Sequence, residues 1–112
     1  MKALSQIGQH ASKFCLLQLS DAYAFNSSLH DPSLNEILTW SRKLRNFPCE
    51  EEGILPVLDM AKAVCEMGYD GWWSFETFEL YMWDESPGVP NELAKRAWTS
   101  WQNVKAGMGF QD

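Results

Sequence analysis

Positive charge is scarce in this sequence, and the basic residues are dispersed along it. Nine Lys and Arg residues stand against fifteen Asp and Glu residues, which gives a net charge of −6. Nucleic-acid binding needs a concentrated Lys/Arg surface that neutralises phosphates. The charge pattern therefore argues against a nucleic-acid partner.

Long apolar runs are also missing. No segment approaches the roughly 20 apolar residues of a membrane span, and the first ten residues, MKALSQIGQH, contain no apolar signal core. We therefore expect a cytoplasmic protein with no membrane partner.

Only three cysteines occur, Cys15, Cys49 and Cys65, and none forms a C-x-x-C pair. This spacing argues against a zinc knuckle. Cys15 and Cys65 lie in apolar stretches, so we interpret them as small core residues. Cys49 follows a proline, and no histidine lies near it in sequence, which argues against a catalytic thiol.

The composition is that of one folded domain spanning residues 1–112. Apolar residues make up 46% of the chain and charged residues 21%, as in ordinary globular proteins. Two segments predict strands. Residues 14–19, FCLLQL, form a continuous apolar run typical of a strand buried on both faces of a parallel sheet. Residues 72–78, WWSFETF, follow a Gly-containing turn and predict a second strand.

Helical patterns surround these strands. Residues 2–12 predict a short helix with Leu4 and Ile7 on its apolar face. Residues 56–67 predict a helix that begins at a proline. Residues 90–104 predict a last helix with Trp98 and Trp101 on its inner face, among other apolar residues.

The long segment over residues 20–53 shows no sustained periodicity and predicts a loop with helical turns around residues 33–38. We interpret its acidic stretch at 50–52 as a solvated loop, and Trp40 as a candidate pocket residue. A loop this long in a compact domain is often functional.

The strand–helix–strand unit in the middle predicts two parallel strands and an α/β fold. In such folds ligands bind at the C-terminal ends of strands, where Gln18 and Glu76 fall. Taken alone, Glu76 is more typical of a solvated strand residue. Two strands leave unpaired edges, so we expect either a fragment or partner strands from another chain.

Four motifs carry a resemblance to a known family: LLQLSDA at 16–22, WSRKLRNFPCEEEGILPVLDM at 40–60, GYDGWWSFETF at 68–78 and VPNELAKRAWTSW at 89–101. Residues 13–104 resemble the C-terminal part of a xylose isomerase-like TIM barrel, of the sugar phosphate isomerase/epimerase superfamily. Within it the motifs are most similar to 3-dehydroshikimate dehydratases. The resemblance implies a partial (β/α)8 barrel whose last two parallel strands are present.

The resemblance also implies a metal site. Members of the family bind one divalent ion through four side chains at strand ends, and Gln18 and Glu76 match two of those positions. Oxygen ligands favour Mg²⁺ or Mn²⁺, with Co²⁺ as a third option. The remaining two ligands and the catalytic base belong to strands that this sequence does not contain, so no catalytic residue is assigned.

Ser41 and Arg45 match the family's substrate-contacting serine and arginine, whereas Arg42 in the same motif carries no implied role. An arginine suits the ring carboxylate of 3-dehydroshikimate because it can donate two parallel hydrogen bonds. The substrate implied is a small molecule, either a cyclic hydroxy-keto acid or a sugar.

The resemblance thus implies the C-terminal part of a metal-dependent lyase that converts 3-dehydroshikimate to protocatechuate. Two alternatives stay open: a sugar isomerase or epimerase of the same superfamily, and an inactive remnant or accessory subunit. We expect the 112-residue chain to be inactive by itself, and to need either an oligomeric partner or a missing N-terminal half-barrel.

Overall fold

A computed structural model describes residue 6 and residues 8–111 of the chain. Leu4 and Ile7, which the predicted helix over residues 2–12 places on its apolar face, lie outside these residues. Gly8–Lys13 form a short 3-10 helix, η1, instead of the end of an α-helix. It leads directly into the first strand.

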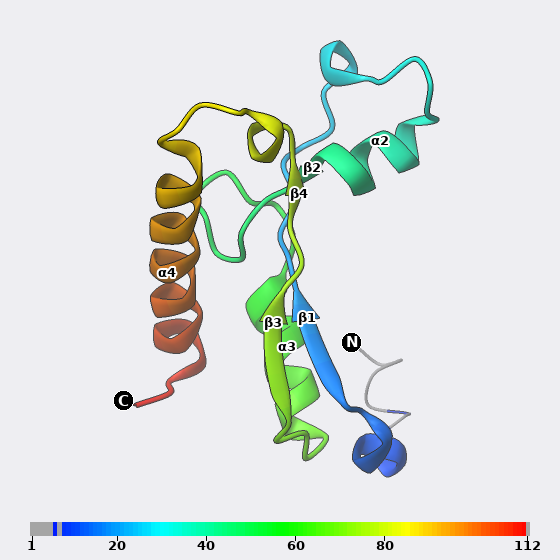
Figure 1. Cartoon of the computed structure of the whole chain (residues 1–112). Coiled ribbons are helices and arrows are strands. Elements are labelled where there is room, and N and C mark those ends of the chain that lie inside the picture. The colour runs from blue at the N-terminus through cyan, green and yellow to red at the C-terminus, as the bar shows by residue number, and fades with distance from the viewer. Residues whose placement is uncertain (1–5, 7, 112) are drawn as a thin grey trace.

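The predicted parallel pair is confirmed. Strand β1 (Leu16–Leu19) pairs with β3 (Trp72–Phe75) in parallel, with Gln18 opposite Ser74. The two strands lie side by side in the centre of the molecule (Figure 1). The chain is therefore a mixed α/β structure, as the sequence indicated.

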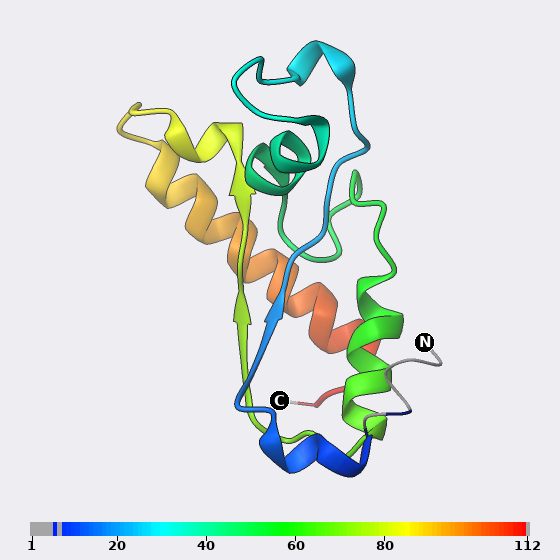
Figure 2. The same ribbon diagram turned by 90° about the vertical axis from the view of Figure 1, so that its right-hand side faces the viewer.

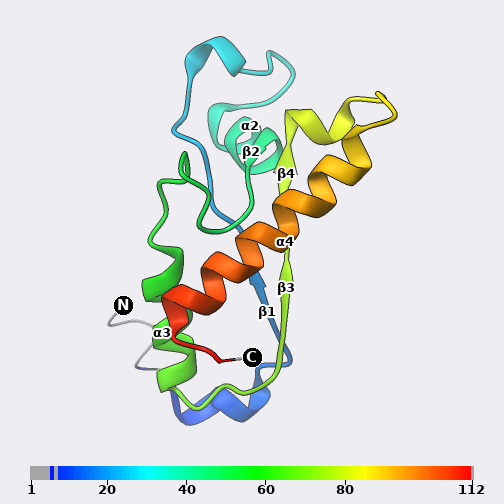
Figure 3. The same ribbon diagram turned by 90° about the vertical axis from the view of Figure 1, so that its left-hand side faces the viewer.

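Two helices pack on one face of this pair. They are α3 (Val57–Glu66) and α4 (Val89–Met108), and α4 crosses the strands diagonally in Figure 3. Leu19, Val57 and Val104 form the buried centre of the core, with Trp73 and Trp101 packed against it. Burial of these apolar side chains holds the helices to the sheet.

The other face of the pair is open, which contradicts the prediction of a strand buried on both faces. Leu16 is 48% exposed and Trp72 80% exposed, and Cys15 is exposed rather than in the core. Side chains alternate between the two faces of a strand, and the helices cover one face alone. Figure 2 shows both helices on the same side of the strands.

The second predicted strand, residues 72–78, is divided in two. After β3 the backbone N–H of Glu76 still donates to the carbonyl oxygen of Leu19, at 2.9 Å. The chain then leaves β1, and a short strand β4 (Phe78–Glu79) pairs antiparallel with β2 (Leu44–Arg45). The backbone stays extended from β3 to β4 and only its partner strand changes. Residues 72–78 therefore look like one strand in the sequence.

The segment over residues 20–53, predicted as a loop with helical turns around residues 33–38, contains a full helix, α2 (Glu36–Lys43). Its first turn is stabilised by the Asn35 side chain, which accepts a hydrogen bond from the N–H of Leu38 at 2.9 Å. The helix continues directly into β2, so α2, β2 and β4 lie together beyond the C-terminal ends of β1 and β3 (Figure 1). Two further 3-10 turns, η2 (Ser27–Leu29) and η3 (Leu80–Trp83), belong to the same end.

Within the part of the chain that the structure covers, no helix has the length and apolarity needed to cross a membrane.

Candidate functional site

A cavity of about 480 Å³ lies at the C-terminal end of the parallel strands. Its wall combines side chains from the segment after β1, from α2 and β2, and from the segment after β3. The lining residues are Ser20, Ser41, Arg42, Arg45, Glu76, Phe78 and Trp83. The position is where α/β folds bind ligands, and it contains three of the four site residues expected from the sequence.

Arg45 is held in place by the segment that follows β1. Its Nε–H donates to the backbone carbonyl oxygen of Asp21 at 3.1 Å, and its Nη2 donates to the hydroxyl of Ser20. A guanidinium carries five N–H donors, so donors remain for a ligand. Because Arg45 is partly buried, its orientation is set before any ligand arrives.

Ser41 and Arg42 come from the last turn of α2, immediately before β2. Both are exposed at the cavity, and the Arg42 side chain makes no hydrogen bond or ion pair with any residue from 8 to 111. The cavity thus contains two guanidinium groups and one carboxylate, that of Glu76. The excess of positive charge suits an anionic ligand.

Glu76 and Gln18 lie on the open face of the strand pair. Gln18 stands opposite Ser74 in the parallel register, and alternation along the strand puts Ser74 and Glu76 on the same face. Both Gln18 and Glu76 are exposed. Glu76 lines the cavity together with Ser41 and Arg45, but Gln18 does not. Gln18 lies farther from the strand ends, opposite Ser74, which precedes Glu76 by two residues.

A protein of Neurospora crassa named 3-dehydroshikimate dehydratase is 36% identical to this chain over 102 aligned residues. The match includes 83% of the chain and spans 28% of that protein's length. No family model matches the chain, and no solved structure gives a significant match. The similarity to a 3-dehydroshikimate dehydratase indicated by the four sequence motifs is thereby confirmed.

The side chains at the open face fit a hard metal ion in kind but not in number. Glu76 offers a carboxylate and Gln18 an amide oxygen, the ligand types that Mg²⁺ and Mn²⁺ prefer. Among residues 8–111, however, no group of three or more His, Cys, Asp or Glu side chains converges as a metal site would require. These two residues can therefore serve only as part of a larger ligand set.

The sequence motifs did not single out three of the lining residues. Ser20 follows β1 within the QLSDA motif, where its hydroxyl contacts Arg45. Phe78 and Trp83 form an aromatic wall, and Trp83 is 73% exposed. Trp40, expected as a pocket residue, is absent from the lining; its indole N–H instead donates to the carbonyl oxygen of Tyr23 at 2.7 Å.

Proposed function

We propose that this chain is the C-terminal part of a xylose isomerase-like (β/α)8 barrel that acts as a divalent-metal-dependent lyase, dehydrating 3-dehydroshikimate to protocatechuate. One observation carries the proposal: Ser41, Arg45 and Glu76 meet in one cavity at the C-terminal end of two parallel strands. The similarity to the Neurospora protein supports it.

The barrel part of the proposal rests on the open sheet. Each of β1 and β3 has a strand neighbour on one edge only within residues 8–111, and unpaired edges of this kind are normally covered or paired. The exposed Leu16 and Trp72 lie on the side away from the helices. In a (β/α)8 barrel the side away from the helices is the packed interior.

In the proposed reaction the residues of this chain bind and orient the substrate. Arg45 and Ser41 hold the ring carboxylate, and the fixed Arg45 guanidinium determines which ring carbon faces Glu76. Phe78 and Trp83 offer apolar side chains for contact with the ring. A Mg²⁺ or Mn²⁺ ion held by Glu76 and Gln18, with further ligands from outside this chain, would supply Lewis-acid polarisation of the ring ketone.

The dehydration removes one ring proton and one ring hydroxyl as water and leaves an aromatic ring after enolisation. No group in this chain is assigned as the base that takes the ring proton. A sugar isomerase or epimerase would use the same metal ligands, but Arg45 beside Arg42 favours a carboxylate-bearing substrate over a neutral sugar. The incomplete ligand set favours an inactive remnant as the second candidate.

Complementation tests the proposal with the chain as it is. The 112-residue chain is co-expressed with the remainder of the Neurospora enzyme, the part outside the matched region, and protocatechuate formation from 3-dehydroshikimate is followed with and without added Mn²⁺. We expect product only when both parts and the metal are present. A ketose converted in place of 3-dehydroshikimate would favour the isomerase alternative.

A pair of matched variants tests the ligand assignment in that complex. Glu76→Gln keeps the shape of the side chain and removes its charge, so we expect turnover to fall by at least about 100-fold. Glu66→Gln makes the same change on the exposed outer side of α3 and should leave turnover unchanged. Unchanged turnover in Glu76→Gln would refute the role of Glu76. Complex formation without product, for all metals tried, would favour the inactive remnant.

A further inference from the structure

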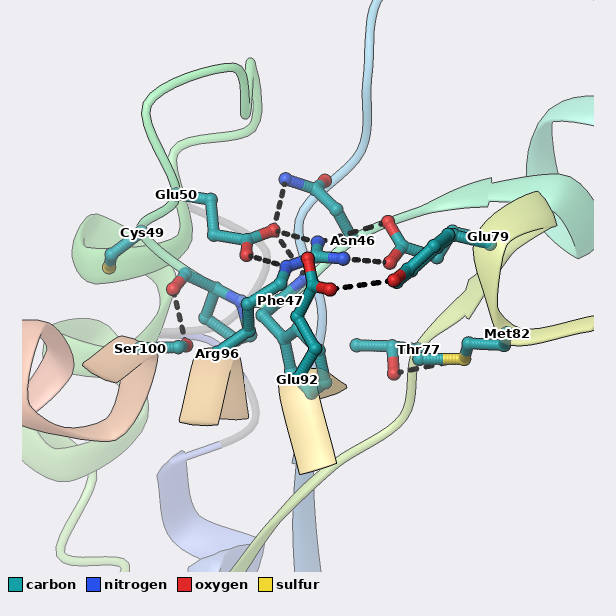
Figure 4. A network of polar contacts seen from close by, with 12 residues as sticks. Asn46, Phe47, Cys49, Glu50, Thr77, Glu79, Met82, Glu92, Arg96 and Ser100 are labelled. Carbon is teal, nitrogen blue, oxygen red and sulfur yellow. Dashed lines mark hydrogen bonds and ion pairs between the residues drawn. The ribbon is translucent and has the colours of Figure 1, made fainter. Parts of the chain in front are cut away.

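Arg96 on α4 binds two carboxylates at once, on the side of the β2–β4 ribbon away from the cavity. Its Nε donates to Glu50 Oε1 at 2.8 Å and its Nη2 to Glu50 Oε2 at 2.9 Å. The same guanidinium donates from Nη1 to Glu79 Oε1 and from Nη2 to Glu79 Oε2 at 3.1 Å. Figure 4 shows Arg96 between these two acids. Paired, charge-assisted contacts of this kind fix direction as well as distance.

These contacts lie on both sides of Arg45 along the backbone. On one side, Glu79 stands opposite Leu44 in the β2–β4 register. On the other side, Glu50 Oε2 accepts hydrogen bonds from the backbone N–H of Phe47 and from the Asn46 side chain, each at 3.2 Å. The backbone of Arg45 therefore lies between Leu44, which pairs with Glu79, and Asn46, which is bound to Glu50, and Arg96 binds both of these acids.

The same cluster holds the segment that the Arg45 side chain touches. The Tyr23 hydroxyl donates to Glu79 Oε2 at 2.7 Å, and the Tyr23 N–H donates to the carbonyl oxygen of Leu44 at 3.0 Å. The N–H of Asp21 donates to the carbonyl oxygen of Asn46 at 3.0 Å. Both partners of the Arg45 guanidinium, Ser20 and Asp21, thus belong to a segment that is bound to the backbone of residues 44–46 and, through the Tyr23 hydroxyl, to Glu79.

The cluster formed by Arg96, Glu50, Glu79 and Tyr23 is partly buried, so its carboxylates depend on the Arg96 guanidinium. The Glu79 side chain is 3% exposed and that of Arg96 25% exposed. A buried carboxylate without a partner is costly, so loss of Arg96 would force Glu79 or Glu50 to move. Burial, together with the hydrogen bond to Glu79, raises the pKa of Tyr23, which keeps its hydroxyl protonated as a donor. The cation also lies over the Phe47 ring, 5.3 Å from its centroid.

We propose that Arg96 is a positioning residue for the anion-binding site: through Glu79 and Glu50 it fixes the strand and the segment that orient the Arg45 guanidinium. Pre-orientation of a binding group spares a ligand the cost of ordering it. The positioning of Arg45 is independent of the ligand, whereas the choice of 3-dehydroshikimate as probe rests on the proposed function.

The first measurement uses no ligand. In ¹⁵N-labelled chain, the Nε–H signal of Arg45 reports its hydrogen bond to Asp21 through its shift and its exchange with water. We expect Arg96→Lys, which keeps the charge but loses the planar set of donors, to move this signal and speed its exchange at least about tenfold. Lys95→Met, a charge loss at the exposed neighbouring position, should leave it unchanged. An unchanged Arg45 signal in folded Arg96→Lys would overturn the proposal.

A milder variant guards against loss of folding. Tyr23→Phe removes a single hydroxyl from the cluster and leaves both ion pairs of Arg96 in place. We expect a smaller displacement of the Arg45 Nε–H signal in the same direction, while backbone signals of β1 and β3 stay where they are. No displacement in this variant, together with an unfolded Arg96→Lys, would show that the cluster serves stability alone and would overturn the positioning role.

The second measurement is titration with 3-dehydroshikimate, arranged as a double-mutant cycle. We expect Arg96→Lys to weaken binding about tenfold or more when Arg45 is present, and to have no effect in an Arg45→Met background. Equal weakening in both backgrounds would overturn the proposal. If neither the unmodified chain nor its complex with the remainder of the Neurospora enzyme binds 3-dehydroshikimate, the substrate assignment of the proposed function fails, while the Nε–H measurement still decides the role of Arg96.

Discussion

Gly53 lies against the buried carboxylate of Asp21, and its replacement by alanine is a quantitative test of how the loop before α3 is held. Asp21 is 3% exposed, and its Oδ1 accepts hydrogen bonds from the N–H groups of Ala22 and Leu55, both at 2.8 Å. A Cβ atom added at Gly53 would lie 2.8 Å from Oδ1 and would overlap the rest of the carboxyl group. Either the carboxylate or the loop must move, and the bond to Leu55 is lost.

The magnitude follows from that one bond. A hydrogen bond to a charged group contributes about 1.5–3 kcal/mol. Replacing glycine by alanine returns about 0.4–1 kcal/mol by restricting the unfolded chain. We therefore expect Gly53→Ala to lower the free energy of unfolding by about 1–2 kcal/mol, which in a domain of this size corresponds to roughly 5–15 °C in Tm.

A double-mutant cycle identifies the cause. In an Asp21→Ala background the overlapping group is gone, so Gly53→Ala should be neutral or slightly stabilising, and the coupling energy should equal the loss seen in the native background. Thermal and urea unfolding followed by circular dichroism supply all four values. Gly88→Ala is the control, because a Cβ there meets nothing within 4 Å. The reasoning is refuted if Gly53→Ala costs no more than Gly88→Ala, or costs the same in both backgrounds.

Two further predictions concern titratable groups. Burial raises the pKa of the Cys49 and Cys65 thiols, whereas Cys15 is exposed. A thiol reagent at pH 8 should therefore label Cys15 first. Mass spectrometry of the partly labelled chain measures the order of labelling, and faster labelling of Cys49 would contradict the prediction. The hydrogen bond from Lys43 holds the pKa of Asp31 well below its usual range, so its contribution to stability is present above the unfolded-state pKa of about 3.9 and is lost as pH falls below it. Urea unfolding between pH 6 and pH 2 (a range chosen to bracket that pKa) should show a smaller fall in stability for Asp31→Asn than for the native chain; equal falls would contradict the assignment.

The parallel strand pair could be predicted because its signals are local. The apolar runs, the helix pattern between them and the handedness rule for such units together determine that β1 and β3 run in the same direction. The change of partner at residues 76–78 could not be predicted, because β4 is extended like β3 and differs only in its neighbour, β2. Sequence periodicity reports the backbone conformation but not the partner strand.

Side-chain directions on the helices were predicted less well. Trp101 packs against the core as expected, but Trp98 is 65% exposed, since the contact face of α4 is centred on Ser100 and Val104. Helix α2 was predicted only as helical turns around residues 33–38, although a local signal for its start existed: Asn35 followed by Glu36 is a typical helix start. The turn signals around it outweighed that pair of residues.

Three of the four candidate site residues named from the sequence motifs lie together in the structure, but the contacts that hold Arg45 in place were not predicted. Ser41, Arg45 and Glu76 do share a cavity. The acidic stretch at 50–52 was interpreted as a solvated loop; Glu51 and Glu52 are exposed as expected, but Glu50 is bound to Arg96, 46 residues away in sequence. Ion pairs between distant segments depend on how the chain folds back, which no local pattern records.

The open face of the strand pair and the Arg96 cluster have separate roles. Leu16 and Trp72 expose large apolar surface. Covering such surface contributes about 25 cal/mol per Å², which favours association with further strands. That gain does not order the cavity, because Arg45 lies at the strand ends and not on the exposed face. The contacts of Arg96 with Glu50 and Glu79 order it from within the chain. A site built in this way needs no partner to orient its guanidinium, so we expect complementation to depend on the open face and the strength of ligand binding to depend on the cluster.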